Sequence, residues 1–134
     1  MSNPFEPMMT KAYWEKSREK GTLYLEYPIC GRRIDGLVVL DGNSSKAAVS
    51  GKRAPKPEEL SGKQVIVLQT KRNKLGMGVA GQTIISKTLL EQAGVKVVDA
   101  VAICLEMDEK ILGALEKHGC YAVVLADPKD SVRK

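Results

Sequence analysis

The chain has little of what several common kinds of site require. It holds one histidine and three cysteines in 134 residues, and Cys30, Cys104 and Cys120 form no CxxC or Cys/His spacing. A structural zinc site and a disulfide framework are therefore not expected. His118 follows a predicted helix, where a cation at the helix end explains it better than nucleophilic catalysis does. Candidate site residues must be sought among carboxylates, amides and lysines.

Long apolar runs are also missing. No stretch of eighteen apolar residues and no signal-like segment at the N-terminus occurs, so we expect an intracellular, cytoplasmic protein with no membrane partner. A hydrophobic content of 43% with 28% charged residues is ordinary for a globular domain, and 134 residues support one core. We expect a flexible leader over residues 1–9, one domain over residues 10–126 and a tail over residues 127–134.

Basic residues outnumber acidic ones, 21 to 16, which gives a formal net charge of +5. An excess of this sign fits a polyanionic partner such as DNA. Two groups of basic residues lie close to the polar strands described below. They are the predicted DNA-binding residues Lys52, Arg53, Lys56, Arg72 and Lys74.

Local patterns predict an α/β fold with a mixed central sheet. A helix over residues 10–20 is expected to end at Gly21, and Asp41–Gly62, rich in Gly, Ser, Lys and Pro, is expected to be an exposed, mobile loop. Further helices are predicted over residues 79–92 and 108–117. Strands are predicted over residues 22–29, 32–40, 63–71, 97–105 and 121–126.

Two successive strands carry polar residues that a plain strand would not choose. The first contains Asp35, and the second ends in Gln69-Thr70-Lys71. Strand alternation places Gln69 and Lys71 on one face, and consecutive strands usually pair, so Asp35 should converge with Gln69. Carboxylate and amide oxygens are ligands for Mg²⁺, and a nearby lysine can stabilise charge on a phosphate. The pattern predicts metal-dependent hydrolysis of a phosphodiester.

With Ile34-Asp35-Gly36 before Gln69-Thr70-Lys71, the chain resembles the PD-(D/E)xK (restriction-endonuclease-like) nuclease superfamily. The neutral Gln69 is most similar to the D…QxK variant of Mrr-like restriction nucleases. The resemblance covers residues 10–105 in topology and about ten residues in motif. It implies an α-β-β-β-α-β core, here with an added C-terminal α-β.

The resemblance also implies roles for individual residues. Asp35 would be the central ligand of Mg²⁺ or Mn²⁺, Gln69 a second ligand, and Lys71 the residue that positions water and stabilises the transition state. A glutamate from the first helix or first strand often completes such sites, and Glu26 is a better candidate than Glu15. Gln82 matches a supporting polar position. The chain departs from the family pattern because no proline precedes Asp35 and because Gln69 carries no charge.

The function expected from these residues is DNA endonuclease activity in restriction, repair or junction processing. So small a domain could need a homodimer to cut both strands. One alternative is a catalytically inactive nuclease-fold module for DNA binding or assembly. Another is a nucleotide-binding protein that uses the GxGxxG of Gly76–Gly81, with Asp99 further along. Residues 71–75 separate that motif from the preceding strand, which counts against a dinucleotide fingerprint.

Overall fold

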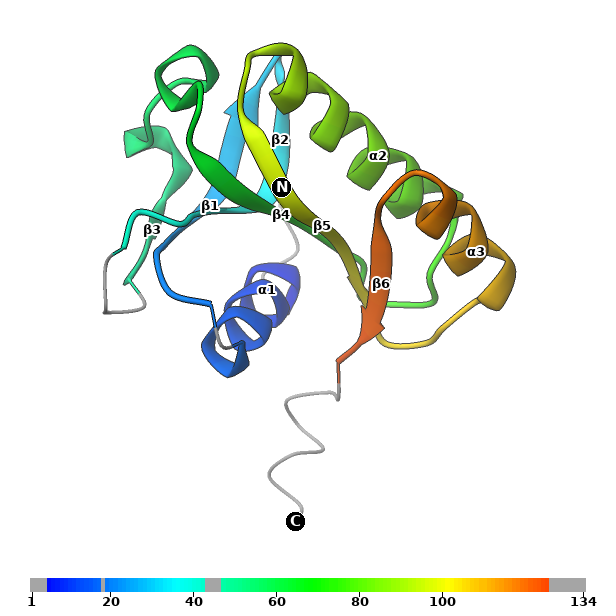
Figure 1. The fold of residues 1–134 in the computed structure, drawn as a ribbon. Coiled ribbons are helices and arrows are strands. Elements are labelled where there is room, and N and C mark those ends of the chain that lie inside the picture. The colour runs from blue at the N-terminus through cyan, green and yellow to red at the C-terminus, as the bar shows by residue number, and fades with distance from the viewer. Residues whose placement is uncertain (1–4, 18, 43–46, 126–134) are drawn as a thin grey trace.

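A computed structural model describes residues 5–17, 19–42 and 47–125. It is a six-stranded mixed sheet with helices on both faces, as the sequence predicts (Figure 1). Helix α1 covers one face, and helices α2 and α3 cover the other. The elements are α1 (Phe5–Lys16), β1 (Thr22–Ile29), β2 (Arg32–Val39), β3 (Ala47–Ser50), the 3₁₀ helices η1 (Gly51–Arg53) and η2 (Pro57–Leu60), β4 (Gln64–Thr70), α2 (Met77–Gln92), β5 (Lys96–Cys104), α3 (Glu109–Lys117) and β6 (Tyr121–Val124).

The strand order in the sheet is β3-β1-β2-β4-β5-β6. Strand β2 is antiparallel to both of its neighbours, β1 and β4, whereas β4, β5 and β6 are parallel and joined through α2 and α3. A tight turn at residues 30–31 allows the β1–β2 pair, and the parallel pairs β4–β5 and β5–β6 need the helical crossovers. As predicted, the strand with Asp35 and the strand with Gln69 are neighbours in the sheet.

Alternation along β4 divides the core into two layers. Val65 and Val67 belong to the cluster beneath α2 and α3, and Ile66 and Leu68 belong to the cluster beneath α1. A strand buried on both faces is apolar at every position, which explains the continuous run of β4. Gln69 is therefore unusual, because it is a polar side chain buried at the end of this run.

Two expectations about disorder are wrong for the residues that the structure describes. Helix α1 begins at Phe5, and Met9 is fully buried, so residues 5–9 are part of the domain. Pro7 fits this start, because proline is tolerated in the first turn of a helix. Residues 1–4 and the tail from residue 127 onward lie outside the described residues.

The predicted loop over residues 41–62 is also structured in its second half. Strand β3 pairs in parallel with β1, and η1 and η2 follow, with Gly51 and Leu60 buried. Its short length and the absence of a strong alternating pattern hide such an edge strand from sequence reasoning. None of the described helices is long and apolar enough to cross a membrane.

Candidate functional site

Asp35 lies where the regular ladder between β2 and β4 stops. The last regular pair is Gly36 with Leu68, one step before Asp35 and Gln69. Beyond it, the Asp35 Oδ2 atom accepts a hydrogen bond from the Thr70 backbone N–H at 2.7 Å. The Asp35 N–H donates to Gln69 Oε1 at 3.3 Å. The structure thus brings Asp35 and Gln69 together, as expected from the strand order.

The Gln69 side chain is held by both of its polar atoms. It is 2% exposed, and its Nε2 atom donates to Ser86 Oγ of α2 at 2.9 Å. Because the Asp35 backbone N–H can only donate, the amide oxygen must be the atom that faces Asp35. An amide oxygen has two lone pairs, so Oε1 retains the capacity to contact a second group.

The surroundings of Asp35 disfavour its negative charge. Burial, with smaller contributions from the charges of Glu6 and Glu26, raises the pKa of Asp35 from its ordinary value of 3.8 to about 6, although the hydrogen bond from Thr70 lowers it. A neighbouring cation would have the opposite effect, since it favours the ionised form. The carboxylate therefore occupies a position that a positive charge would stabilise.

Glu26 lies opposite Asp35 across the hairpin, as predicted. The pairs Leu25 with Gly36 and Tyr27 with Ile34 flank it, and its own backbone is in the left-handed region with φ of 54°. Its Oε2 atom is 3.8 Å from Arg33 Nη1, in an ion pair that is largely exposed. Strain of this kind in a non-glycine residue costs free energy and is often found at functional sites.

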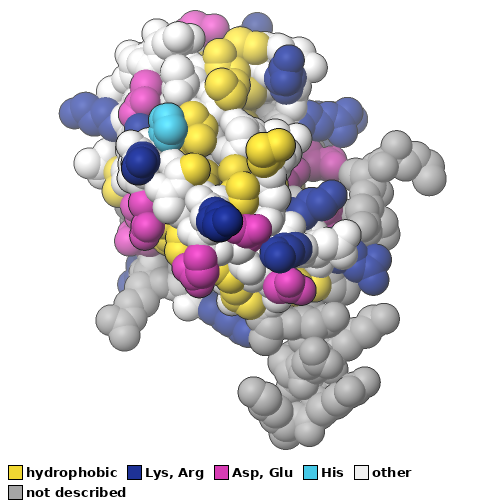
Figure 2. Space-filling model, turned by 90° about the vertical axis from the view of Figure 1, so that its right-hand side faces the viewer, with side chains coloured by type: hydrophobic (Ala, Val, Ile, Leu, Met, Phe, Trp, Pro, Cys, Tyr) yellow, Lys and Arg dark blue, Asp and Glu magenta, His cyan; other side chains and the backbone are white. Residues whose placement is uncertain are grey.

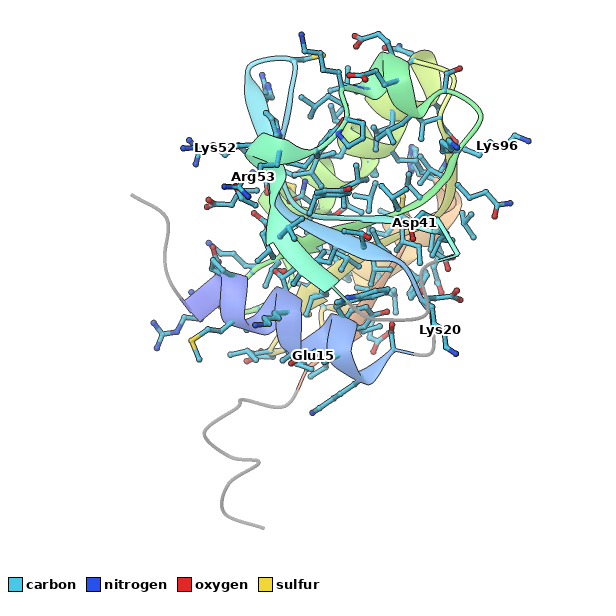
Figure 3. All side chains as sticks on the ribbon, turned by 90° about the vertical axis from the view of Figure 1, so that its left-hand side faces the viewer. Glu15, Lys20, Asp41, Lys52, Arg53 and Lys96 are labelled. Atoms are coloured by element: carbon cyan, nitrogen blue, oxygen red, sulfur yellow. The ribbon has the colours of Figure 1, made fainter. Side chains whose placement is uncertain are left out.

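Glu6 is a site residue that sequence reasoning missed. It lies in the first turn of α1, its Oε2 atom accepts from Arg72 N–H at 3.1 Å, and its charge reaches Asp35. The expected alternative, Glu15, is nine residues away, about 13 Å along the helix axis. It is exposed near the other end of α1 (Figure 3). Pro7 was the available signal, because it marks a first helical turn and would have placed Glu6 in it.

Two threonines join α1 to the end of β4. The Oγ1 atoms of Thr10 and Thr70 are 2.6 Å apart and buried, and Thr10 also donates to the backbone oxygen of Glu6 at 2.9 Å. The helix can approach this closely because of Gly36. A Cβ atom there would lie 2.7 Å from Thr10 Cγ2. The glycine after Asp35 therefore helps to position α1 beside the site.

Lys71 and Gln82 line an adjacent hollow. Lys71 directly follows β4, and its backbone N–H donates to Ile103 O at 2.8 Å. Its side chain is exposed and lines a hollow of about 260 Å³ together with Lys74 and Gln82. Gln82 also lines the neighbouring groove that contains Gln69. Gln82 thus lies between the hollow and the groove. No described contact joins Lys71 directly to Asp35.

The predicted DNA-binding residues are all exposed. Lys52 and Arg53 belong to η1, which packs against β1 so closely that a Cβ atom on Gly51 would lie 2.8 Å from the Glu26 carbonyl carbon. Their side chains project from one edge, away from Lys96 (Figure 3). Lys74 is partly occupied by acidic partners, since its Nζ is 3.7 Å from Glu106 and 4.0 Å from Asp108.

Other candidate chemistries are less well placed. The single histidine, His118, is exposed on the face that α2 and α3 form (Figure 2). Its Nδ1 is 2.9 Å from Ala114 O. Asp99, which the dinucleotide interpretation would need, lines a pocket with Tyr13 and Trp14 of α1, on the face of the sheet opposite α2. Among the described residues, no three His, Cys, Asp or Glu side chains form a group that could hold a metal ion.

Comparisons with known proteins identify the fold. No protein-family model matches the chain, and none of the curated proteins has a matching sequence. Among solved structures, the chain is similar to a repair endonuclease from Pyrococcus abyssi, with a TM-score of 0.61 and 21% sequence identity. The likeness covers 96% of this chain and 50% of that protein, so the chain spans half the length of the endonuclease that it matches. The fold is therefore a nuclease-like α/β fold.

Proposed function

We propose that this protein is a DNA endonuclease that uses a divalent metal ion to hydrolyse phosphodiester bonds. The observation that carries the proposal is the half-buried carboxylate of Asp35, which accepts from Thr70 N–H, beside the Gln69 amide oxygen, which accepts from the Asp35 backbone N–H, at the end of a paired β2–β4 ladder. A half-buried acid whose pKa is raised destabilises a fold at neutral pH, so a structural role explains it poorly. The likeness of the fold to a repair endonuclease supports the same reading.

The residues present fit a hard divalent cation. Carboxylate and amide oxygens suit Mg²⁺ or Mn²⁺, and the charges of Glu6 and Glu26 add to the negative potential at Asp35. Asp35, Gln69 and Glu26 would hold the ion, with Glu6 as a further candidate. When bound, such an ion neutralises phosphate charge and makes water easier to deprotonate.

The remaining roles belong to the chain's own side chains. Lys71, as an exposed cation beside the site, would hold a phosphate oxygen or the attacking water and offset the negative charge that develops on phosphorus. Gln82, which is also exposed, can donate a hydrogen bond from its amide to the same phosphate. Lys52, Arg53 and Lys56 would draw DNA towards this edge of the molecule.

The finer resemblance, to PD-(D/E)xK nucleases of the D…QxK, Mrr-like kind, is part of this proposal. Its support is the placement of Gln69 beside Asp35, with Lys71 directly after the strand that carries Gln69. The resemblance also suggests a homodimer, since one site cuts one strand. Nicking at low protein concentration, with double-strand cuts appearing as concentration rises, is the expected behaviour of such a dimer.

The test is a cleavage assay on supercoiled, linear and four-way-junction DNA with Mg²⁺, Mn²⁺ or EDTA. We expect cleavage by the wild type with either metal, and loss of at least a hundredfold in rate for Asp35→Asn and Lys71→Ala. Lys96→Ala, which removes an exposed lysine on the opposite side, is the matched control and should cut normally. A comparison of Glu6→Gln with Glu15→Gln tests which glutamate of α1 contributes to cleavage.

Cleavage that survives both Asp35→Asn and Lys71→Ala would indicate a contaminating nuclease. No cleavage by a folded wild type with either metal would reject the proposed activity.

The inactive DNA-binding module is the second candidate, and one observation favours it. Gln69 is neutral, and both of its polar atoms already have protein partners. A neutral ligand lowers the charge of a site and therefore its affinity for a metal. This candidate predicts DNA binding that is indifferent to Mg²⁺ and to the Lys71→Ala substitution.

A further inference from the structure

A groove of about 370 Å³ lies beside Gln69, between the tip of the β1–β2 hairpin and α2. The hairpin contributes Ile29 and two arginines. Helix α2 contributes a surface that begins with glycines and continues with apolar and polar side chains. Its lining includes Arg32, Arg33, Gly81, Gln82, Ile85 and Leu89.

The glycines keep the first part of the α2 wall clear. A Cβ atom on Gly78 or Gly81 would meet nothing within 4 Å, so packing against the described residues does not require a glycine at either position. Glycine inside a helix is less stable than alanine, because it loses more backbone freedom on folding. The two glycines leave an open space that forms part of the groove. This space is what offsets the lower helix stability of glycine.

The groove combines positive charge with exposed apolar surface. Arg32 and Arg33 are exposed on one wall, and Ile85, 52% exposed, forms part of the other with Leu89 behind it. The two arginines and the nearby Lys71 favour an anionic ligand. Intact duplex DNA offers phosphates and sugars on its outside and keeps its base faces stacked inside. An unpaired base offers a flat apolar face that can cover Ile85 and Leu89.

We propose that this groove binds one unpaired nucleotide of a DNA strand, next to the phosphate at Asp35 and Gln69. The base of this nucleotide lies against Ile85 and Leu89, and its edge accepts or donates a hydrogen bond at the Gln82 amide. The phosphate of the same nucleotide contacts Arg32 and Arg33. The inference rests on the proposed function and names its substrate class, which is DNA with single-stranded nucleotides at an end, a flap or a loop.

The experiment measures DNA binding by fluorescence anisotropy in EDTA, so that cleavage plays no part. Three probes of equal length are compared: single-stranded oligothymidine, an abasic strand with the same phosphates, and a duplex. The abasic strand keeps the charge and removes the bases. Base stacking predicts that the wild type binds oligothymidine between about fivefold and a hundredfold more tightly than the abasic strand.

Two variants test the groove itself. Gly81→Leu fills it, and Gly113→Leu is the matched control, because Gly113 in α3 also has nothing within 4 Å of a built Cβ and does not line the groove. Both should raise the melting temperature by roughly 2–6 °C through helix propensity. Gly81→Leu should remove the preference for bases, whereas Gly113→Leu should keep it. Ile85→Ser, at an exposed position, should weaken the preference without filling the groove.

The outcomes separate this inference from the proposed function. Equal binding of oligothymidine and the abasic strand by the wild type overturns the inference, and so does an unchanged preference in Gly81→Leu. An equal loss in Gly113→Leu also overturns it. A parallel reaction with Mg²⁺ measures cleavage. Cleavage without a base preference would support the endonuclease activity and reject nucleotide binding in the groove. A base preference that Gly81→Leu removes, without any cleavage, would support nucleotide binding in the groove of a catalytically inactive module.

Discussion

Replacing Asp35 with asparagine should stabilise the fold at neutral pH. The raised pKa of Asp35 means that the folded protein binds its proton more tightly than the unfolded chain does. Between pH 3.8 and about 6 the unfolded chain loses this proton first, so the free energy of unfolding falls as pH rises. Above about pH 6, the full loss of unfolding free energy caused by the ionised Asp35 is present. The folded and unfolded pKa values of Asp35 differ by roughly two units, and at about 1.4 kcal/mol per unit the ionised carboxylate lowers the free energy of unfolding by about 3 kcal/mol.

Asparagine keeps the shape of the side chain and an oxygen that can accept from Thr70 N–H, but it carries no charge. The stronger hydrogen bond that a carboxylate accepts from Thr70 is already contained in the difference of about 3 kcal/mol, because it lowers the pKa of Asp35 and the value of about 6 includes that effect. We therefore expect Asp35→Asn to be about 3 kcal/mol more stable than the wild type at pH 7.5. The difference should shrink, and then vanish, as pH falls below about 4.

The assay is urea denaturation of both proteins at pH 4, 5, 6 and 7.5, with Glu15→Gln as a control for removing an exposed carboxylate. A second series adds Mg²⁺ at pH 7.5, which should stabilise the wild type and leave Asp35→Asn unchanged, because a ligand stabilises only the form that binds it. If Asp35→Asn were no more stable than the wild type at pH 7.5 and the difference did not change with pH, the argument from burial would be refuted.

Three further predictions concern other parts of the site. Gln69→Glu should lower the Mg²⁺ concentration needed for half-maximal cleavage several-fold, since it adds a charged ligand; a higher requirement would contradict the assigned role. Gly36→Ala should destabilise the fold by about 1–3 kcal/mol in urea denaturation, because its Cβ would lie 2.7 Å from Thr10 Cγ2; a neutral result would mean that α1 can move away. Substituting Lys52 and Arg53 with alanine together should reduce the slope of log affinity for DNA against log salt by about 2; an unchanged slope would remove both residues from the DNA-binding surface.

Much of the candidate site could be predicted because it depends on short-range rules. The placement of Gln69 beside Asp35 required only strand alternation and the pairing of consecutive strands. Glu26 followed from the hairpin, whose register is set by the turn at residues 30–31. These relations hold within one strand or between neighbours in the chain, where periodicity carries the information.

The sequence by itself determined the order of the α-helices and of every described strand except β3, and the approach of Asp35 to Gln69. Only the tertiary structure decided that Glu6 joins the site, that β3 covers the edge of β1, and that η1 packs against β1 at Glu26. Each of these depends on contacts between segments far apart in the chain, such as the bond from Arg72 N–H to Glu6. Local patterns specify which face of an element is buried, but they do not specify which distant element buries it. That choice is made by the packing of the whole core, where shapes must fit at close contact.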